Sequence, residues 1–513
     1  MLRGILTVGG WTMASRLLGF ARDMLIAALA GTGPVADAFF VALRLPNLFR
    51  RLFGEGAFNA AFVPEFTGVL ATEGHAPARR FADEALGVMV FWLGLLTALG
   101  EAFMPGVMAV LAPGFGREPG KFELVVQLSR ITFPYLFLIC LAALVSGVLN
   151  GLDRFAAAAA APVVFNLVSI AAMLLLTPYV PTVGHALAWG VSVSGALQLA
   201  LLLVAARRAG IALRLPRPRL TPAMRKLFRR MGPGLVGAGV TQINLAVDTI
   251  IISWLPPGSA ALLNYADRVN QLPLGVIGTA MGTALLPLLS RQARTGQGAA
   301  ARETLNRAIE LCFSLTLPAA FALGAAGGPI MLVLFARGAF TPDAARLAAQ
   351  SLAAYSLGLP AFVLLKVLVP MFFAHGDTRT PMWVGFAAIA LNLTLNLLLM
   401  VPLRHMGPAL ATTLSSTFNA AFLAVLLARR GWFAADARLR QRLPRLGASS
   451  LAMACVLAAL DRTVFAQLAA DPGWRWAGLA LLVGVGAATY GAVAYLLGAL
   501  RPREMLAGLR RGG

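Results

Sequence analysis

The pattern of hydrophobic and polar positions divides most of the chain into long apolar stretches joined by short polar connections. Each stretch is long enough to cross the hydrocarbon core of a bilayer as an α-helix, which takes about 20 residues. We therefore expect an all-α integral membrane protein with about 14 transmembrane helices. The expected spans are 5–30, 36–70, 84–112, 124–150, 157–180, 184–206, 232–255, 260–290, 305–335, 345–374, 381–402, 407–428, 447–469 and 474–499.

Composition supports this interpretation and indicates on which side of the membrane the connections lie. Of the 513 residues, 59% are hydrophobic and 12% charged, and the mean hydropathy is +0.78, which is typical of a membrane protein. The net charge of +22 would suggest a nucleic-acid partner in a soluble protein. Here the basic residues gather in a few connections, above all 207–230 and 429–445. The positive-inside rule explains that pattern, so we expect both termini in the cytoplasm and no nucleic-acid partner.

Reactive residues do not form a catalytic pattern. The three cysteines lie in separate apolar stretches, the four histidines are scattered, and no phosphate-binding glycine motif is present. These features favour a transporter over an enzyme or an ATP-driven pump.

One apolar region, from Ser15 to Phe66, is unusually rich in charge. It contains Arg16, Arg22, Asp23, Asp37, Arg44, Arg50, Arg51 and Glu55. A charge at a helix centre costs about 2.5–3.5 kcal/mol on insertion scales, so such residues normally face a bundle interior or a wet cavity. Helical spacing places Asp37, Arg44, Arg51 and Glu55 on one narrow stripe, with Asn47 near its edge. The stripe predicts a cationic pocket for an anionic substrate. A packing network of salt bridges, or arginines that reach the membrane interface, is the alternative.

Similar motifs recur about 223 to 227 residues apart. Leu45-Pro46 matches Leu272-Pro273, and Asn166 matches Asn392. The repeat predicts two six-helix lobes related by a pseudo-twofold axis along the membrane normal, with a cavity between them. The expected divisions are an N-lobe at 1–208, a basic cytoplasmic linker at 209–230, a C-lobe at 231–430, and a C-terminal helix pair with its tail at 431–513.

Four motifs give the chain a family resemblance: SRLLGFARD, DAFFVALRLPNLFRRLFGEGAFNAAFVP, YADRVNQLPLGVIGTAMGTALLP and GDTRTP. With these motifs the chain resembles the MurJ (MviN-type) lipid II flippases of the MOP superfamily. The resemblance implies two lobes around a cationic cavity, two further helices that bind a polyprenyl tail, and transport of lipid II from the inner to the outer leaflet by alternating access.

The resemblance also implies which residues act. Arg16, Arg22, Arg51 and Arg268 would bind the substrate together with the acids Asp37 and Glu55. Asp23, Arg44 and Asn47 are secondary cavity candidates.

Some members of the family bind sodium in the second lobe, and no other cofactor is expected. The matching positions are Asp248, Asn392, Asn396 and Thr412. Asn396 stands where some relatives have an acid, so amides that only pack helices together are the alternative.

The expected setting is the bacterial cytoplasmic membrane. We expect a monomer in contact with lipid II and membrane lipids, with other cell-wall synthesis proteins as candidate partners. Another exporter of the superfamily, for a different polyprenyl-diphosphate sugar or for cationic drugs, is an alternative function. A membrane enzyme acting on polyprenyl phosphates is a second alternative, but it would need clustered acids or histidines.

Overall fold

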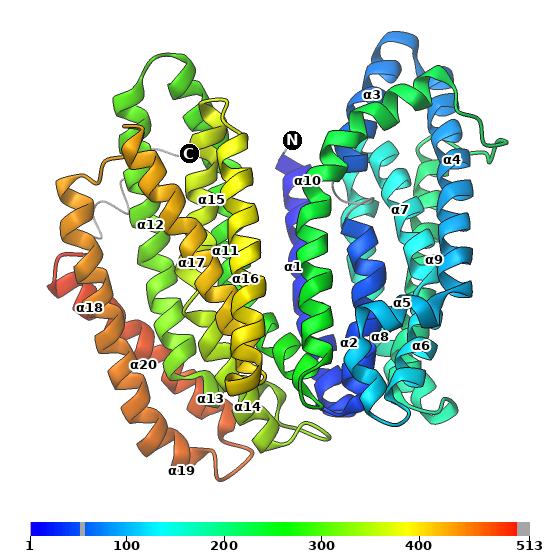
Figure 1. Ribbon diagram of the computed structural model, residues 1–513. Helices are drawn as coiled ribbons and strands as arrows, with labels where there is room; N and C mark the ends of the chain where they lie inside the picture. The colour runs from blue at the N-terminus through cyan, green and yellow to red at the C-terminus, as the bar shows by residue number, and fades with distance from the viewer. Residues whose placement is uncertain (1, 52–56, 500–513) are drawn as a thin grey trace. The chain divides into compact units, whose positions relative to one another are not determined.

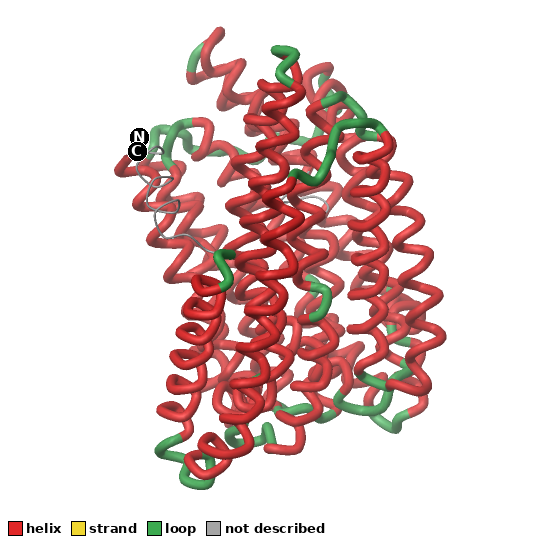
Figure 2. The backbone as a smooth tube through the Cα atoms, turned by 90° about the vertical axis from the view of Figure 1, so that its left-hand side faces the viewer, coloured by secondary structure: helices red, strands yellow, loops and turns green. Residues whose placement is uncertain are grey.

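Helices make up the regular structure of the described chain. A computed structural model describes residues 2–51 and 57–499, and these residues contain helices and loops but no strand (Figure 2). The chain divides into two compact units. The first comprises Met1–Ala261 and the short segment Arg337–Phe340, and the second comprises Leu262–Ala336 and Thr341–Gly513.

The first unit is built from the helices at the blue to green end of Figure 1. They are α1 (Leu2–Ala30), α2 (Pro34–Phe49), α3 (Ala57–Glu73), α4 (His75–Ala102), α5 (Met104–Leu111), α6 (Lys121–Thr132), α7 (Pro134–Gly151), α8 (Phe155–Leu176), α9 (Val183–Arg208) and α10 (Pro222–Ser253). Helix α1 packs on α8, and α9 packs on α7 and α8.

The second unit takes up nearly all of the rest of the chain. Its helices are α11 (Ser259–Arg294), whose first turn belongs to the first unit, α12 (Gly298–Ala325), α13 (Gly327–Phe335), α14 (Pro342–Ser356), α15 (Leu359–Ala374), α16 (Arg379–Leu403), α17 (Met406–Arg429), α18 (Ala437–Leu460), α19 (Ala466–Leu468) and α20 (Arg475–Leu496). Helix α16 packs on α17, and α18 packs on both α12 and α20.

The predicted spans coincide with these helices. Each of the fourteen contains one long helix or two or more consecutive shorter ones. Within the described part of the chain, ten helical stretches are long and apolar enough to cross a membrane. The number fourteen itself stays a prediction.

Several expected spans are divided into two or more helices, in two cases at a proline. The stretch 124–150 divides into α6 and α7 at Phe133, because Pro134 lacks the N–H that would continue the hydrogen-bond ladder. The stretch 345–374 divides at Gly358 for the same reason, since Pro360 is the second residue of the next helix. The π-helical turn Asp461–Phe465 separates α18 from α19.

The core of the first unit extends beyond the expected N-lobe. Residues 211–221 form no helix, but Ile211 is 1% exposed and packs in this core. Helix α10 then begins at Pro222 and places Met224, Leu227 and Met231 in the same core. The compact units therefore differ from the expected division, in which 209–230 is a linker and α10 opens the C-lobe. The lobe boundaries stay a prediction.

Candidate functional site

Helix α1 presents two of the predicted substrate-binding arginines. Its orientation is set by α8, where the Asn166 side-chain amide donates to the Ser15 carbonyl oxygen at 3.0 Å. The Arg22 guanidinium pairs with Asp23 at 2.8 Å and lies over the ring of Phe165. Arg16 is exposed and forms no ion pair with any described residue.

Helix α2 carries the next group. Arg44 donates to the Thr249 hydroxyl of α10 at 3.0 Å, and Asn47 accepts from Arg50 at 3.3 Å. Helix α2 ends at Phe49, and Arg50 and Arg51 lie in a π-helical turn. Because this turn changes the helical phase, the expected α-helical stripe does not continue regularly to Arg51. Arg51 is exposed, and Glu55 lies outside the described residues.

Asp37, also on α2, is held by partners inside the first unit. Its side chain is 2% exposed and forms a salt bridge of 3.1 Å with the Lys121 ammonium group. The carboxylate also accepts from the backbone N–H groups of Gly258, at 2.6 Å, and Ala261, at 3.0 Å. These two N–H groups lie at the start of α11, where a helix has unpaired donors and a partial positive charge. The geometry gives Asp37 a structural role, and its contact with substrate stays a prediction.

Lys121 was not found by sequence reasoning. It is 3% exposed although it begins α6 in a connection that reads as polar and nearly neutral. Glu118, three residues earlier, also contacts its ammonium group at 3.0 Å. The three-residue spacing of Glu118 and Lys121 is the only sequence signal for an ion pair at Lys121, since Asp37 is 84 residues away from Lys121 in the chain.

The fourth predicted arginine lies on α11 in the second unit. Arg268 is half-buried, and its neighbour Asp267 accepts a hydrogen bond from Gln271 one turn further along the helix. Gathering of Arg268 with the arginines of α1 and α2 in one cavity stays a prediction.

The predicted sodium ligands fall in both units. Asp248 lies on α10 of the first unit, while the other three lie on α16 and α17 of the second. Asn396 donates to the Asn392 side-chain oxygen at 3.0 Å, and Asn392 donates to the Thr412 hydroxyl at 3.4 Å. These oxygens suit a hard cation chemically. The first of these hydrogen bonds lies within α16 and the second joins α16 to α17. Sodium binding and the packing alternative both stay predictions.

Each of the four arginines has a side chain that suits an anion. Arg16 and Arg51 are exposed, and Arg22 and Arg268 are half-buried, although all four come from largely apolar segments. A guanidinium group offers paired, charge-assisted hydrogen bonds to phosphate oxygens. In chemical terms these residues could bind a phosphorylated lipid, and they include no nucleophile or acid–base pair.

Comparison with known proteins decides the family. The family model described as "Lipid II flippase MurJ" matches residues 26–471. The chain belongs to the lipid II flippase MurJ family. A probable lipid II flippase MurJ from Rhizobium meliloti (strain 1021) is 44% identical over 519 residues, covering 100% of this chain and 97% of the relative. A probable MurJ from Vibrio cholerae is 35% identical and covers 97% of this chain and 96% of the relative.

Solved structures have the same fold. A lipid II flippase MurJ in an inward closed conformation matches with a TM-score of 0.79 at 23% identity, covering 95% of this chain and 98% of the other. An inward-facing multidrug transporter of the MATE family, from the MOP superfamily, matches with a TM-score of 0.69 at 11% identity over 83% of this chain and 97% of the other. The resemblance of the four motifs to MurJ is thus confirmed, as is a MurJ/MATE-like helical fold.

Proposed function

We propose that this protein is a lipid II flippase, a transporter and not an enzyme, in the inner membrane of a bacterium. The proposal is supported by membership of the MurJ family and by relatives of nearly equal length that are named lipid II flippases. Lipid II would be carried from the inner to the outer leaflet.

The mechanism we propose is alternating access between two lobes. Six helices of each lobe would surround a central cavity, and the last two helices would complete the fourteen and hold the polyprenyl tail. A cavity that opens sideways lets this long apolar tail remain in lipid while the sugars and peptide cross in water. We also propose that the protein acts as a monomer.

The observation that carries the proposal is the set of accessible arginines in apolar segments. Arg16 and Arg51 form no ion pair with a described residue, although charge in such segments is costly. The diphosphate of lipid II would supply the anion that these residues lack. Replacing one of them by Ala should lose about 1.5–3 kcal/mol per charged hydrogen bond.

The test is complementation in a strain depleted of its own flippase, with lipid II in the outer leaflet measured directly. Arg51→Glu and Arg268→Glu should abolish growth and lipid II export, because a carboxylate repels the diphosphate. Arg51→Lys should restore part of the activity, since it keeps the charge and loses the planar fork. Arg440→Glu, at an exposed arginine near the start of α18, is the matched control and should support growth.

The amount of each variant in the membrane is measured alongside. Normal lipid II export by Arg51→Glu and Arg268→Glu at normal levels would overturn the binding role. If a variant is missing from the membrane, binding of lipid II to the purified Arg51→Ala and Arg268→Ala proteins decides instead.

A further inference from the structure

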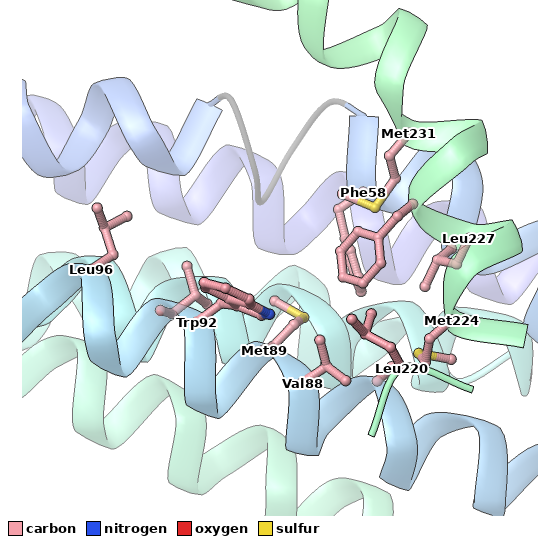
Figure 3. Close-up of a pocket in the computed structure, with 12 residues that line it drawn as sticks. Phe58, Val88, Met89, Trp92, Leu96, Leu220, Met224, Leu227 and Met231 are labelled. Carbon is pink, nitrogen blue, oxygen red and sulfur yellow. The ribbon is translucent and has the colours of Figure 1, made fainter. Parts of the chain in front are cut away.

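A groove on the first unit lies outside the arginine site. It has a volume of about 490 Å³ and lies between one face of α4 and the segment that begins α10, with Phe58 of α3 at its side (Figure 3). Met89, Trp92 and Leu96 line it on α4, and Leu220, Leu227 and Met231 line it opposite. The lining is apolar throughout. The face of α4 used here, from Ala85 to Leu96, is about 16 Å long, so the groove suits an extended hydrocarbon chain.

The second wall of this groove is fixed to α4 by specific contacts. The backbone N–H of Arg214 donates to Asp83 at 2.7 Å, and the Thr221 hydroxyl donates to Glu84 at 2.7 Å. Pro216 approaches Gly87 so closely that a Cβ there would lie 2.9 Å from the Pro216 carbonyl oxygen. These contacts hold the two walls of the groove together within the first unit.

The same wall is strongly basic on its outer side. Lys226 and Arg230 both pair with Glu65 of α3, so one of these two positive charges stays unbalanced. Arg219, Arg225 and Arg229 are exposed and form no ion pair with a described residue. Arg225 and Arg229 are one turn apart on α10, on a different face from Leu227 and Met231. Three exposed arginines thus lie on the segment that forms one wall of the apolar groove, next in sequence to the lining residues Leu220, Met224 and Phe228.

We propose that this groove binds an anionic glycerophospholipid of the surrounding membrane. One acyl chain would lie along α4, and the phosphate would contact Arg219, Arg225 and Arg229. Lipid acyl chains would fill an apolar groove that opens to the membrane. Basic residues near the membrane surface attract anionic lipid headgroups. The groove lining includes none of the arginines proposed to bind lipid II, so the proposal does not depend on that function.

The test uses the purified full-length protein in phosphatidylcholine nanodiscs with a small fraction of photoactivatable phosphatidylglycerol, which carries a diazirine on one acyl chain. Crosslinks should map to peptides 85–96 and 220–231. Unlabelled phosphatidylglycerol should compete and phosphatidylcholine should not. Arg225→Gln with Arg229→Gln should weaken binding about 30-fold, from about 1 kcal/mol for each arginine. The matched control is Arg429→Gln with Arg440→Gln, exposed arginines at the end of α17 and near the start of α18, and it should leave labelling unchanged.

Blocking the groove gives an independent readout. Leu96→Trp should remove labelling of both peptides, whereas Ala98→Trp, at an exposed position of α4 outside the groove, should not. Equal labelling by a phosphatidylcholine probe, or no difference between the two arginine pairs, would overturn the proposal. Stronger competition by undecaprenyl diphosphate than by phosphatidylglycerol would also overturn it, because the occupant would then be a polyprenyl tail. The arginine pairs lie on the surface, so they decide the question even if Leu96→Trp fails to fold.

Discussion

At the scale of single residues, the buried pair of Asp37 and Lys121 should contribute strongly to stability. Asp37→Asn leaves the ammonium group of Lys121 in a buried position with Glu118 alone, and it weakens the acceptor for the first N–H groups of α11. Breaking a buried ion pair from one side costs about 3–5 kcal/mol. We expect a clear fall in the thermal unfolding midpoint of the purified protein.

The double variant Asp37→Asn with Lys121→Met is the control for this prediction. The double variant removes the isolated charge of Lys121, so its unfolding midpoint should be higher than that of Asp37→Asn alone. Its midpoint should still be lower than that of the native protein, because the N–H groups of Gly258 and Ala261 then donate to a neutral acceptor. An Asp37→Asn protein with native stability would show that the carboxylate is not needed where the structure places it.

A second prediction at this scale concerns sodium, which we propose binds near Asp248 and Asn392. Sodium chloride should then raise the unfolding midpoint above that in choline chloride, because a ligand that binds the native state stabilises it. Asp248→Asn and Asn392→Ala should each remove the difference. Equal midpoints in the two salts for the native protein, with transport unchanged in sodium-free medium, would leave the amides with a packing role only.

Sequence reasoning selects charged residues for the candidate site but does not identify the residues that pair with them. The cost of charge in an apolar segment singles out Arg16, Arg22 and Asp37, since it depends on each residue and its near neighbours. The contact of Asp37 with Lys121 and with the start of α11 depends on how distant helices pack. Periodicity within one helix carries no information on that packing.

At the scale of elements, a buried acid of α12 is one of the groups that attach α18 to α12. Glu310 of α12 is 8% exposed and pairs with Arg438, at 3.1 Å, and with Arg442 of α18. Arg307 of α12 pairs with the same carboxylate. Glu310→Gln removes the negative charge from all three pairs, so α18 and α20 should exchange amide hydrogens faster than in the native protein. Asp343→Asn, in a pair with Arg346 that is largely exposed, is the matched control and should change stability by less than about 1 kcal/mol. Equal exchange in all three proteins would contradict the prediction.

The connection between α15 and α16 contains a carboxylate with a pH-dependent effect. Hydrogen bonds from Arg430, and then from Thr380, hold the pKa of Asp377 well below its ordinary value. A depressed native pKa adds stability above the unfolded pKa of about 3.9, and this stability is lost as pH falls toward the native pKa. Asp377→Asn should therefore unfold earlier than the native protein at neutral pH, and the difference should shrink below about pH 4. A constant difference across that range would argue against the ionic contribution.

The hydrophobic pattern located the helical segments well. It did not show where these segments are interrupted or which other helices they pack against. A stretch such as 124–150 reads as one span because its apolar content is continuous, while the division at Phe133 depends on the neighbouring Pro134. The hydrophobic pattern also does not show that α10 packs in the core of the first unit. This packing is decided by side chains such as Met224 and Leu227, which find their contacts on helices far away in the sequence.

At the scale of the whole molecule, the distribution of charge predicts topology. We expect both termini and the connections 207–230 and 429–445 in the cytoplasm. The measurement is labelling of single cysteines at Arg217 and Arg440 with a membrane-impermeant reagent, after Cys140, Cys312 and Cys455 have been replaced. Intact cells should remain unlabelled and lysed cells should react at both positions. Labelling of either position in intact cells would reverse the orientation.

The makeup of the first unit also affects the order in which the protein can fold during synthesis. Its core lacks Met224, Leu227 and Met231 until the start of α10 has left the ribosome. Its last piece is Arg337–Phe340, where Ala339 donates to the Ala28 carbonyl oxygen of α1 at 2.7 Å. Helices α1 to α9 therefore leave part of their apolar core uncovered until the start of α10 has been synthesised. The first unit is complete only after α11, α12 and α13 have also been synthesised.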